Sequence, residues 1–479
     1  MKRSNFFTKR TKIVCTIGPA TGSAAMMEQL IRAGMNIARF NLSHGIYSEH
    51  AHHIQTVKKL SRRLAIPVAT LIDLPGPKYR TGKLKDGRVT LNKDTQVMLT
   101  TRQIEGDNKV IPVNLRTLSQ DVKVGDTILL DDGAMQLRVL EKQTTDVKCR
   151  VKVGGTLTEG RGLVVPGMQI SSPFITDTLR ECIDFAINQQ PDYLALSFVS
   201  KAADLTSVRA ILHENDANIP IIAKIERGAA VKRFESILRA SEGIMVARGD
   251  LGVDIPLEKV PLVQKEIIKK CNRAGKPVIT ATQMLESMVN ASRPSRAEVT
   301  DIANAIFDGT DAIMLSEETS IGKYPIQAVK TMTKTAKTTE SVLPYGQMLL
   351  ERGEWIERKT DELISYSACH TAHSLRAAAL IAFTQSGNTA GRVSRYRPRM
   401  PILAISPSTV VVGRLLMLWG VYPFEINGAS SVEHLFATGA KLSRELGLAK
   451  RGDLIVITGG IPVGIAGSTN LLKVERVEE

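Results

Sequence analysis

Short apolar runs alternate with longer stretches in which apolar residues recur every three or four positions, over residues 11–73 and again over 172–345. This alternation predicts strands that are each followed by an amphipathic helix, as in the segment 262–275. The predicted strands lie at residues 12–18, 35–41, 67–73, 192–198, 220–226, 243–249, 277–283 and 312–316. Eight parallel strands close into a barrel. The pattern therefore predicts an α/β protein whose central domain, residues 1–73 and 172–345, is a (β/α)8 TIM barrel.

Polar side chains that can bind phosphate or metal ions stand at the C-terminal ends of these strands. In a parallel barrel the loops from every strand meet at that end, so we expect these side chains to share one mouth. Such a concentration of chemistry is typical of an enzyme. The residues are Arg39, Asn41, Ser43, Asp73, Ser197, Lys224, Glu226, Arg248, Asp250, Thr282 and Ser316.

Residues 74–171 interrupt the barrel pattern between its third and fourth strands. Short strands separated by Asp-Gly, Gly-Asp and Gly-Gly turns, with almost no helical spacing, predict a small inserted antiparallel β-barrel domain. The insertion begins at Pro75-Gly76-Pro77 and ends near Pro166-Gly167. Joints of this kind beside a barrel mouth predict a hinged lid, although rigid linkers also use proline and glycine.

Residues 346–479 begin with a helical segment and then alternate strands with helices again. This order predicts a C-terminal domain built on an open, mostly parallel α/β sheet of about five strands. No cluster of catalytic residue types accompanies it, so a regulatory role is the expectation.

Composition narrows the class of partner. The formal net charge is +15, but aromatic residues are only 4% of the chain and the basic residues are spread along it. Nucleic-acid binding would require a basic stripe with aromatic stacking partners, so anionic small molecules are the expected partners. No run approaches the ~20 apolar residues of a membrane span, and no signal peptide is expected. Five scattered cysteines without a CxxC pair indicate neither disulfides nor zinc, so the cytoplasm is the expected location.

The candidate catalytic and metal-binding residues are most concentrated in the segments AKIERGAAV and VARGDLGV. Lys224 and Glu226 stand two residues apart on one strand, so both point to the same face, and Asp250 follows the next strand. Two carboxylates without histidine or thiolate suit a hard ion such as Mg²⁺, with Mn²⁺ as an alternative. The ammonium of Lys224 would stabilise charge on a transferring phosphoryl group. An ordinary buried salt bridge is the simpler alternative.

The usual nucleotide motifs are missing. The chain has neither GxxxxGK[ST] nor a GxGxxG after a strand, which gives no support to a P-loop enzyme or a dinucleotide-binding dehydrogenase. Phosphates would then be held by side chains such as Arg39, Arg80 and Lys201.

Longer motifs resemble the pyruvate kinases, in the same order and over essentially the whole chain. They are TKIVCTIGPAT, ARFNLSHG, GPKYRTG, AKIERGAAV, MVARGDLGV, TATQMLESM, RPSRAEVTDIANAIFDGTDAIMLSEET and GIPVGIAGSTNLLKV. The resemblance implies a cytoplasmic glycolytic homotetramer that uses Mg²⁺ (or Mn²⁺) to transfer the phosphoryl group of phosphoenolpyruvate to ADP, giving pyruvate and ATP. An aldolase or lyase acting on an oxaloacetate-like acid is the alternative, because a lysine, Mg²⁺ and an enolate serve that chemistry too.

The resemblance also assigns catalytic roles. Glu226 and Asp250 match the divalent-metal ligands, and Lys224 matches the lysine that stabilises the transition state. Arg39 matches the arginine on the substrate phosphate. Thr282 matches the threonine near the enolate carbon, where it would order proton delivery.

Binding roles follow from the same resemblance. The backbone of Gly249 and Asp250 matches the cradle of the substrate carboxylate, beside Arg39, Lys224 and Thr282. The positions that resemble nucleotide-phosphate contacts are Asn41, His44, Arg80 and Lys201.

The monovalent-cation site departs from the family's common pattern. Asn41, Ser43, Asp73 and the Leu74 carbonyl correspond to the oxygen ligands of K⁺ in many members, but Lys78 stands where K⁺-requiring members carry glutamate. An ammonium there can supply the positive charge, so we expect activity without K⁺. A solvated hinge lysine is the alternative.

Three further positions depart from that pattern, namely Pro75, Ala229 and Glu317. Pro75 is expected to stiffen one lid joint because proline fixes φ. For Glu317 we have no physical account, and Ala229 affects only local loop contacts.

A loop of small and hydroxyl residues in the C-terminal domain resembles the family's effector phosphate site. It comprises Thr384, Gln385, Ser386, Gly387, Asn388 and Thr389. A sugar phosphate or AMP is the expected effector, with Arg392 or Arg395 as auxiliary contacts. Such loops are also common helix caps, which is the alternative.

Overall fold

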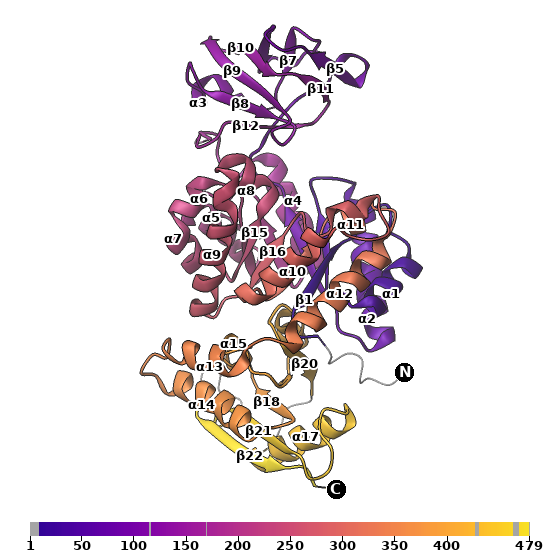
Figure 1. Cartoon of the computed structure of the whole chain (residues 1–479), viewed down its shortest axis with the longest axis vertical. Coiled ribbons are helices and arrows are strands. Elements are labelled where there is room, and N and C mark those ends of the chain that lie inside the picture. The colour runs from indigo at the N-terminus through magenta and orange to yellow at the C-terminus, as the bar shows by residue number, and fades with distance from the viewer. Residues whose placement is uncertain (1–8, 115, 169, 427–430, 463–468, 479) are drawn as a thin grey trace.

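The computed structural model describes residues 9–478 except 115, 169, 427–430 and 463–468. Figure 1 shows three parts stacked along the long axis, with the β-rich insertion at the top, the barrel in the middle and the C-terminal domain at the bottom. In this described part of the chain, no helix is both long and apolar enough to cross a membrane. Part of the motif GIPVGIAGSTNLLKV falls outside the described residues.

The barrel forms as predicted. Eight strands close it in the order β1-β17-β16-β15-β14-β13-β3-β2, and every neighbouring pair is parallel. The strands are β1 (Lys12–Thr16), β2 (Ile37–Asn41), β3 (Ala69–Leu74), β13 (Tyr193–Leu196), β14 (Ile221–Ile225), β15 (Gly243–Ala247), β16 (Val278–Ala281) and β17 (Ala312–Leu315).

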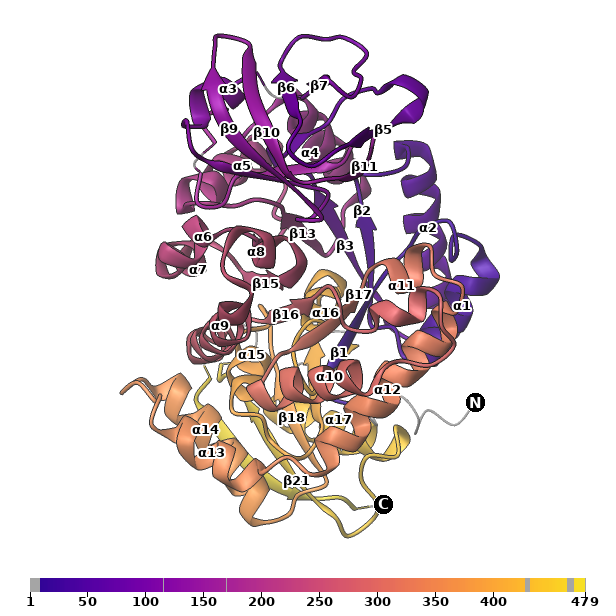
Figure 2. The same cartoon turned by 45° about the horizontal axis from the view of Figure 1, so that its top comes forward.

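Helices surround this barrel, as Figure 2 shows. They are α1 (Ala24–Ala33), α2 (Tyr47–Leu64), α4 (Asp177–Gln189), α5 (Ala202–Glu214), α6 (Gly228–Lys232), α7 (Phe234–Ala240), α8 (Arg248–Asp254), α9 (Val260–Ala274), α10 (Arg296–Asp308), α11 (Glu317–Ser320) and α12 (Pro325–Ser341), with short 3₁₀ turns η3 (Leu257–Lys259) and η4 (Glu286–Val289). Local sequence sets their ends: a capping box of Ser295 and Glu298 starts α10, and Gly309 in a left-handed conformation ends it.

Strand periodicity decides which side chains reach the mouth. On β14, Ile221, Ala223 and Ile225 join the core under the helices, whereas Ile222 belongs to the cluster inside the barrel. Lys224 lies two residues further along the same face, so it projects toward the C-terminal mouth. The fold therefore places this lysine where the other strand ends converge.

The inserted domain has its own apolar core. Its main sheet runs in the order β4-β12-β8-β9-β10-β6-β7, and a second sheet pairs β5 with β11. The edges of the main sheet meet at a bridge between Thr81 and Val113, so the sheet curls into a barrel. The elements are β4 (Tyr79–Arg80), η2 (Lys85–Gly87), β5 (Arg88–Leu91), β6 (Gln96–Thr100), β7 (Val110–Pro112), α3 (Leu118–Asp121), β8 (Thr127–Leu130), β9 (Met135–Lys142), β10 (Asp146–Val153), β11 (Gly155–Thr158) and β12 (Gly162–Val164).

The prediction of a wholly antiparallel insertion is wrong at one pair. Strands β6 and β7 are parallel. The residues between them run back to the end of the sheet where β6 begins, so β7 continues in the same direction as β6. The turn signals in the sequence do not distinguish this crossover from a hairpin.

The C-terminal domain has the open five-stranded sheet that the pattern predicts, in the order β20-β19-β18-β21-β22. All its pairs are parallel except β21 with β22. The elements are α13 (Tyr345–Gly353), α14 (Thr360–Ser374), β18 (Ala379–Phe383), α15 (Asn388–Arg395), β19 (Ile402–Ser406), α16 (Thr409–Leu415), β20 (Val421–Glu425), α17 (Val432–Glu445), β21 (Leu454–Gly459) and β22 (Leu471–Arg476).

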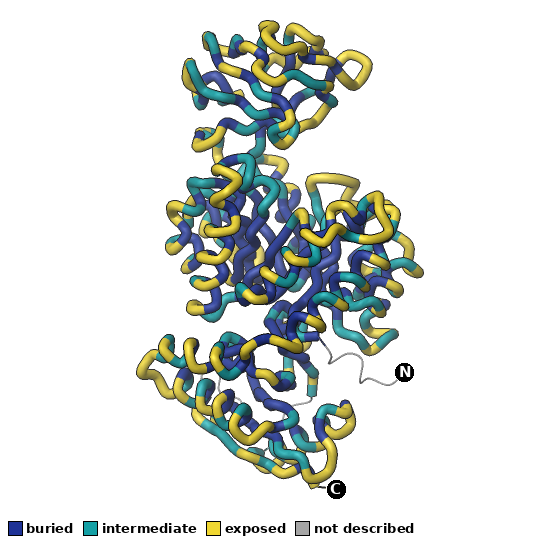
Figure 3. Tube along the Cα trace, in the orientation of Figure 1, coloured by how far each residue is buried: buried dark blue, intermediate teal, exposed yellow. Residues whose placement is uncertain are grey.

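The C-terminal domain also seals one end of the barrel. Leu416 and Met417, directly after α16, belong to the same buried cluster as Ile222 and Met314 from inside the barrel. Figure 3 shows buried residues filling the barrel down to this contact. The N-terminal end is thus closed by apolar packing, and the C-terminal mouth, which faces the inserted domain, remains for chemistry.

Candidate active site

A buried ion network lies at the C-terminal mouth of the barrel and centres on Asp73, whose side chain is only 1% exposed. Its Oδ1 accepts from the Nζ of Lys224 at 3.2 Å and from the hydroxyl of Ser197 at 3.2 Å. Its Oδ2 accepts from the Nε of Arg39 at 2.8 Å, and that guanidinium also donates to Thr16 Oγ1 at 2.8 Å. The network fixes both cations in one place.

The charges in this network set one another's protonation. Burial alone would raise the pKa of Asp73, but Lys224 and Arg39 outweigh it and hold that pKa below its ordinary value. Burial lowers the pKa of Lys224, but the carboxylates of Asp73 and Glu226 outweigh it and raise that pKa. Lys224 is therefore a cation at neutral pH.

Glu226 joins the network from the end of β14. Its Oε1 lies 3.0 Å from the Nζ of Lys224, and its Oε2 accepts the backbone N–H of Phe198 at 2.5 Å. Burial raises the pKa of Glu226, Lys224 opposes that rise, and the nearby charge of Asp250 adds to it. A divalent cation beside these two carboxylates would offset both the burial and the repulsion from Asp250 that raise the pKa of Glu226.

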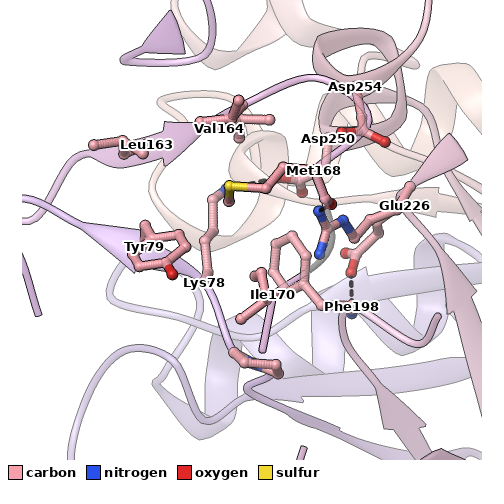
Figure 4. A pocket seen from close by; sticks show the side chains of 13 residues that line it. Lys78, Tyr79, Leu163, Val164, Met168, Ile170, Phe198, Glu226, Asp250 and Asp254 are labelled. Atoms are coloured by element: carbon pink, nitrogen blue, oxygen red, sulfur yellow. Dashed lines mark hydrogen bonds and ion pairs between the residues drawn. The ribbon is translucent and has the colours of Figure 1, made fainter. Parts of the chain in front are cut away.

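Asp250 lies at the start of α8 and faces the same pocket as Glu226 (Figure 4). Its Oδ1 accepts from the Nζ of Lys78 at 2.5 Å, and that ammonium also lies 5.3 Å from the ring centroid of Phe198. Apolar residues of the inserted domain, including Met168, complete the pocket. The pocket is therefore formed jointly by the barrel and the insertion.

The oxygen ligands at the pocket fit a hard divalent ion that takes its remaining ligands from water or from the substrate. In the described part of the chain, no group of three or more histidine, cysteine, aspartate or glutamate side chains could form a complete metal cage. Two carboxylates at one pocket, Glu226 and Asp250, match Mg²⁺ or Mn²⁺, which keep water or substrate oxygens as remaining ligands.

Thr282 follows β16 and lies beside α8. Its hydroxyl accepts the N–H of Gly249 at 2.9 Å and donates to the carbonyl of Ala281 at 2.6 Å. Thr282 and Gln283 both have positive φ, 67° and 57°, a strained backbone for side chains of this size. The hydroxyl is thus held toward the residues expected to cradle the substrate carboxylate.

The residues expected to bind a monovalent cation lie at the ends of β2 and β3, apart from the contacts of Lys78. Asn41 and Asp73 are paired neighbours on β2 and β3, and Asn41 Oδ1 accepts the N–H of Ser43 at 3.2 Å. The Leu74 carbonyl accepts the N–H of Ser197 at 3.3 Å. Among the described contacts, Lys78 meets none of these and binds Asp250 instead.

The nucleotide candidates lie around the network. Burial and then the charges of Arg80 and Arg39 lower the pKa of His44, which places these groups in one electrostatic environment. Arg80 is on β4 of the insertion and donates to the Gly160 carbonyl at 2.9 Å. Lys201 is exposed at the N-terminal end of α5. Among the described residues, Lys201 makes no side-chain contact with the network.

The small-residue loop lies where the sequence predicts it, between β18 and α15. Thr384 Oγ1 accepts the N–H of Gly387 at 2.9 Å, and Gly387 has a φ of 93°. The two auxiliary arginines, however, are taken by acidic partners. Arg392 pairs with Asp361 at 2.5 Å, and Arg395 pairs with Glu362 at 3.1 Å, both on α14.

The structure gives Ser197, a predicted strand-end residue without an assigned role, a definite place: it donates to Asp73 and accepts from Lys224. The sequence analysis missed Thr16, which accepts from Arg39 and ends an apolar strand, the signal that could have found it. Arg227 and Asp254 also line the pocket, although neither was assigned a role from the sequence.

A closed eight-stranded parallel barrel with a buried cationic lysine and two carboxylates at its C-terminal mouth is the architecture of a barrel enzyme. A family model described as the pyruvate kinase barrel domain matches residues 8–329, and one described as the pyruvate kinase alpha/beta domain matches residues 362–475. The chain belongs to the pyruvate kinase family.

Similar proteins agree with this assignment. Pyruvate kinases of Staphylococcus aureus strains MRSA252 and USA300 are each 44% identical over 471 residues, which cover 98% of this chain and 80% of theirs. The crystal structure of a pyruvate kinase from Cryptosporidium parvum superposes with a TM-score of 0.93 at 36% identity, over 99% of this chain and 97% of that one.

Replacing Asp73 by Asn tests the network. Removing the charge leaves Lys224 and Arg39 without their shared buried partner, so we expect a loss of about 3–5 kcal/mol in the free energy of unfolding. The pKa of Asp73 is depressed, so its contribution is full above its ordinary value of 3.8 and is lost as pH falls through the folded value. Urea denaturation at pH 7 and at a pH well below 3.8 measures both.

The exposed Asp216→Asn is the matched control and should change stability by less than about 0.5 kcal/mol. A loss for Asp73→Asn no larger than that of the control would contradict the network.

Proposed function

We propose that this chain transfers the phosphoryl group of phosphoenolpyruvate to ADP at the C-terminal mouth of the barrel, with Lys224 as the group that stabilises the migrating charge. The single observation that supports this proposal is the environment of Lys224. Its ammonium is held by Asp73, Ser197 and Glu226, and the lysine side chain is 9% exposed. Glu226 in turn lines the pocket that Asp250 also lines.

The protein's own charges prepare this site before substrate binds. Lys224 stays protonated because its carboxylate partners raise its pKa, and Arg39 stays oriented by two hydrogen bonds. Preoriented cations at the point where negative charge develops lower the barrier because they need no reorganisation during the reaction. Phosphoryl transfer depends mainly on such positioning and charge stabilisation.

Glu226 and Asp250 would hold the divalent ion. When bound, Mg²⁺ or Mn²⁺ supplies Lewis-acid stabilisation of phosphoryl oxygens.

Thr282 serves the second half-reaction in this proposal. After phosphoryl transfer the enolate of pyruvate must take up a proton at carbon, and the Thr282 hydroxyl is oriented by Gly249 and Ala281. We propose that Thr282 Oγ1 orders the proton delivery at the enolate carbon while Gly249 and Asp250 hold the carboxylate. The nucleotide phosphates would lie near Asn41, His44 and Arg80, with Lys201 reaching in from its exposed position.

Replacing Lys224 by Met should lower the rate of phosphoryl transfer much more than the affinity for phosphoenolpyruvate. We expect kcat to fall by about 10²–10³-fold, with the affinity for phosphoenolpyruvate changed much less, because the ammonium stabilises charge that exists only in the transition state. A lactate dehydrogenase-coupled assay gives kcat, and equilibrium dialysis gives binding.

Lys58→Met is the matched control, since Lys58 donates only to the Gln189 and Gln190 carbonyls away from the mouth. Turnover of Lys224→Met equal to that of the control would refute the proposed role.

We also propose that activity does not require K⁺. Lys78 is 14% exposed, bound to Asp250 and stacked near Phe198, which supports a fixed internal cation over a solvated hinge lysine. Its ammonium contacts Asp250 and, among the described contacts, none of the four proposed cation ligands. A permanent positive charge near the phosphate region would replace the one that K⁺ supplies.

The assay for this proposal compares rates at equal ionic strength in tetramethylammonium chloride and in KCl. The wild-type chain should show the same rate within about twofold, and Lys78→Glu should become slow without K⁺ and recover at least several-fold with it. Near-zero wild-type activity that KCl restores would overturn K⁺ independence.

For the loop after β18 we propose a phosphorylated effector. Its support is the turn of Thr384 and Gly387 that exposes the first N–H groups of α15, together with the exposed hydroxyl of Ser386. Arg392 and Arg395 play no part in this version, because Asp361 and Glu362 bind them. A helix cap without a ligand would have the same local geometry.

Titration of sugar phosphates and AMP at limiting phosphoenolpyruvate tests the effector. At least one compound should shift the saturation curve, and Ser386→Asp should remove that shift by repelling the phosphate while kcat at saturation stays unchanged. No shift with any compound would leave the loop as a helix cap and reject the proposal.

A further inference from the structure

The inserted domain meets the barrel through two joints, and both rest on α8 or its neighbours. The first joint runs through Gly76, where an added Cβ would lie 2.2 Å from the Ser197 carbonyl oxygen, and ends at Lys78, bound to Asp250. The second joint runs through Gly167 and Met168, beside Asp254 at the other end of α8. Figure 4 shows Lys78, Met168, Asp250 and Asp254 around one pocket.

Asp254 connects the second joint to the loop that carries a proposed metal ligand. Its Oδ1 accepts the N–H of Gly167 at 3.2 Å, and its Oδ2 accepts the N–H of Gly228 at 2.7 Å. Gly228 comes two residues after Glu226. One carboxylate, 7% exposed, therefore holds a lid joint and the Glu226 loop together.

Arg227 makes a second, parallel connection. Its side chain is 7% exposed, and its guanidinium donates to the Met168 carbonyl. The residue directly after Glu226 thus binds the lid joint from one side while Asp254 binds it from the other. Glycine at position 228 keeps this contact close, because an added Cβ there would lie 3.0 Å from Ile255 and 3.4 Å from Asp254.

We propose that Asp254 is a positioning residue that couples the orientation of the inserted domain to the position of Glu226. The inference rests on the proposed role of Glu226 in holding the metal. Arg80 sits on β4 of the inserted domain, so a free second joint would let this nucleotide candidate drift relative to Glu226 and Asp250. The contacts of Lys224 with Asp73 and Ser197 involve neither Gly167 nor Met168, so they would remain.

This arrangement predicts which kinetic constants change. Loss of the Asp254 carboxylate should lower kcat by about 10- to 100-fold, because small misplacements of reacting groups have effects of that size. The KM for ADP should rise by about tenfold while the KM for phosphoenolpyruvate changes less than about twofold, because Arg80, one of the nucleotide candidates, lies on the moving domain and the proposed phosphoenolpyruvate contacts lie on the barrel.

The experiment compares Asp254→Ala and Asp254→Asn with the wild-type chain by steady-state kinetics and by amide hydrogen exchange of the metal-free protein. The amides of Gly167 and Gly228 lose their acceptor in the alanine variant and should exchange faster, with the asparagine variant in between because it keeps one acceptor oxygen. Arg227→Met, which removes only the bond to Met168, should change the same constants less.

Asp192→Asn is the matched control. Asp192 also accepts two hydrogen bonds, from the backbone and hydroxyl of Thr70, but at the opposite end of the barrel. It should lower stability without changing the ratio of the two KM values or the exchange at Gly167.

The outcomes separate the possibilities. Faster exchange at Gly167 with unchanged kcat and KM values would show a merely structural bond and overturn the proposal, as would unchanged exchange at Gly167. Faster exchange in the variant, combined with a wild-type protein that does not turn over phosphoenolpyruvate and ADP, would reject the proposed function while keeping the link between Asp254 and the joint.

Discussion

The site depends on one buried carboxylate, Asp73, which binds two cations at once. Without it, Lys224 and Arg39 would be positive charges with little water around them and without a shared partner to orient them. With it, both cations are fixed at the strand ends, and Lys224 also forms an ion pair with Glu226. Electrostatic preorganisation of this kind is established during folding, so the chemistry needs only the metal and the substrates to enter.

The architecture protects this charge network from both ends. Below it, Leu416 and Met417 fill the barrel and exclude water from the N-terminal side. Above it, the inserted domain contributes Lys78 and Met168 to the pocket wall. A low local dielectric strengthens each ion pair in the network and makes its partners obligatory. Each of the three domains has its own apolar core. The barrel and the inserted domain form the pocket at the mouth, and the C-terminal domain closes the opposite end of the barrel.

Local patterns were enough to predict the barrel and several of the side chains that meet at its mouth. The two-residue period of β14 places Lys224 and Glu226 on one face, and the parallel order of the strands brings Asp73 and Asp250 to the same end. The open C-terminal sheet followed from the same alternation of strands and helices. These features depend on spacing within short segments, which a single sequence displays directly.

Long-range pairing could not be predicted in the same way. Lys78 lies 172 residues before Asp250, and nothing local distinguishes this partner from Asp73, the acid of the expected cation site. Arg392 and Arg395 looked available because their acidic partners lie on α14, a different helix. Asp254 escaped notice because it binds backbone N–H groups, which carry no sequence signal. The parallel pairing of β6 with β7 was missed for a related reason, since turns alone do not fix strand order.

The central claim is that Glu226 and Asp250 hold one divalent ion between them, beside Lys224. Binding of Mn²⁺, followed by electron paramagnetic resonance in the absence of substrates, tests it most directly with Glu226→Gln, Asp250→Asn and the double variant. The account predicts that each single change weakens Mn²⁺ binding by at least about tenfold and that the double variant loses less than the sum of the two free-energy changes, as expected for residues that share a ligand. Unchanged Mn²⁺ affinity in either single variant, or strictly additive losses, would contradict it.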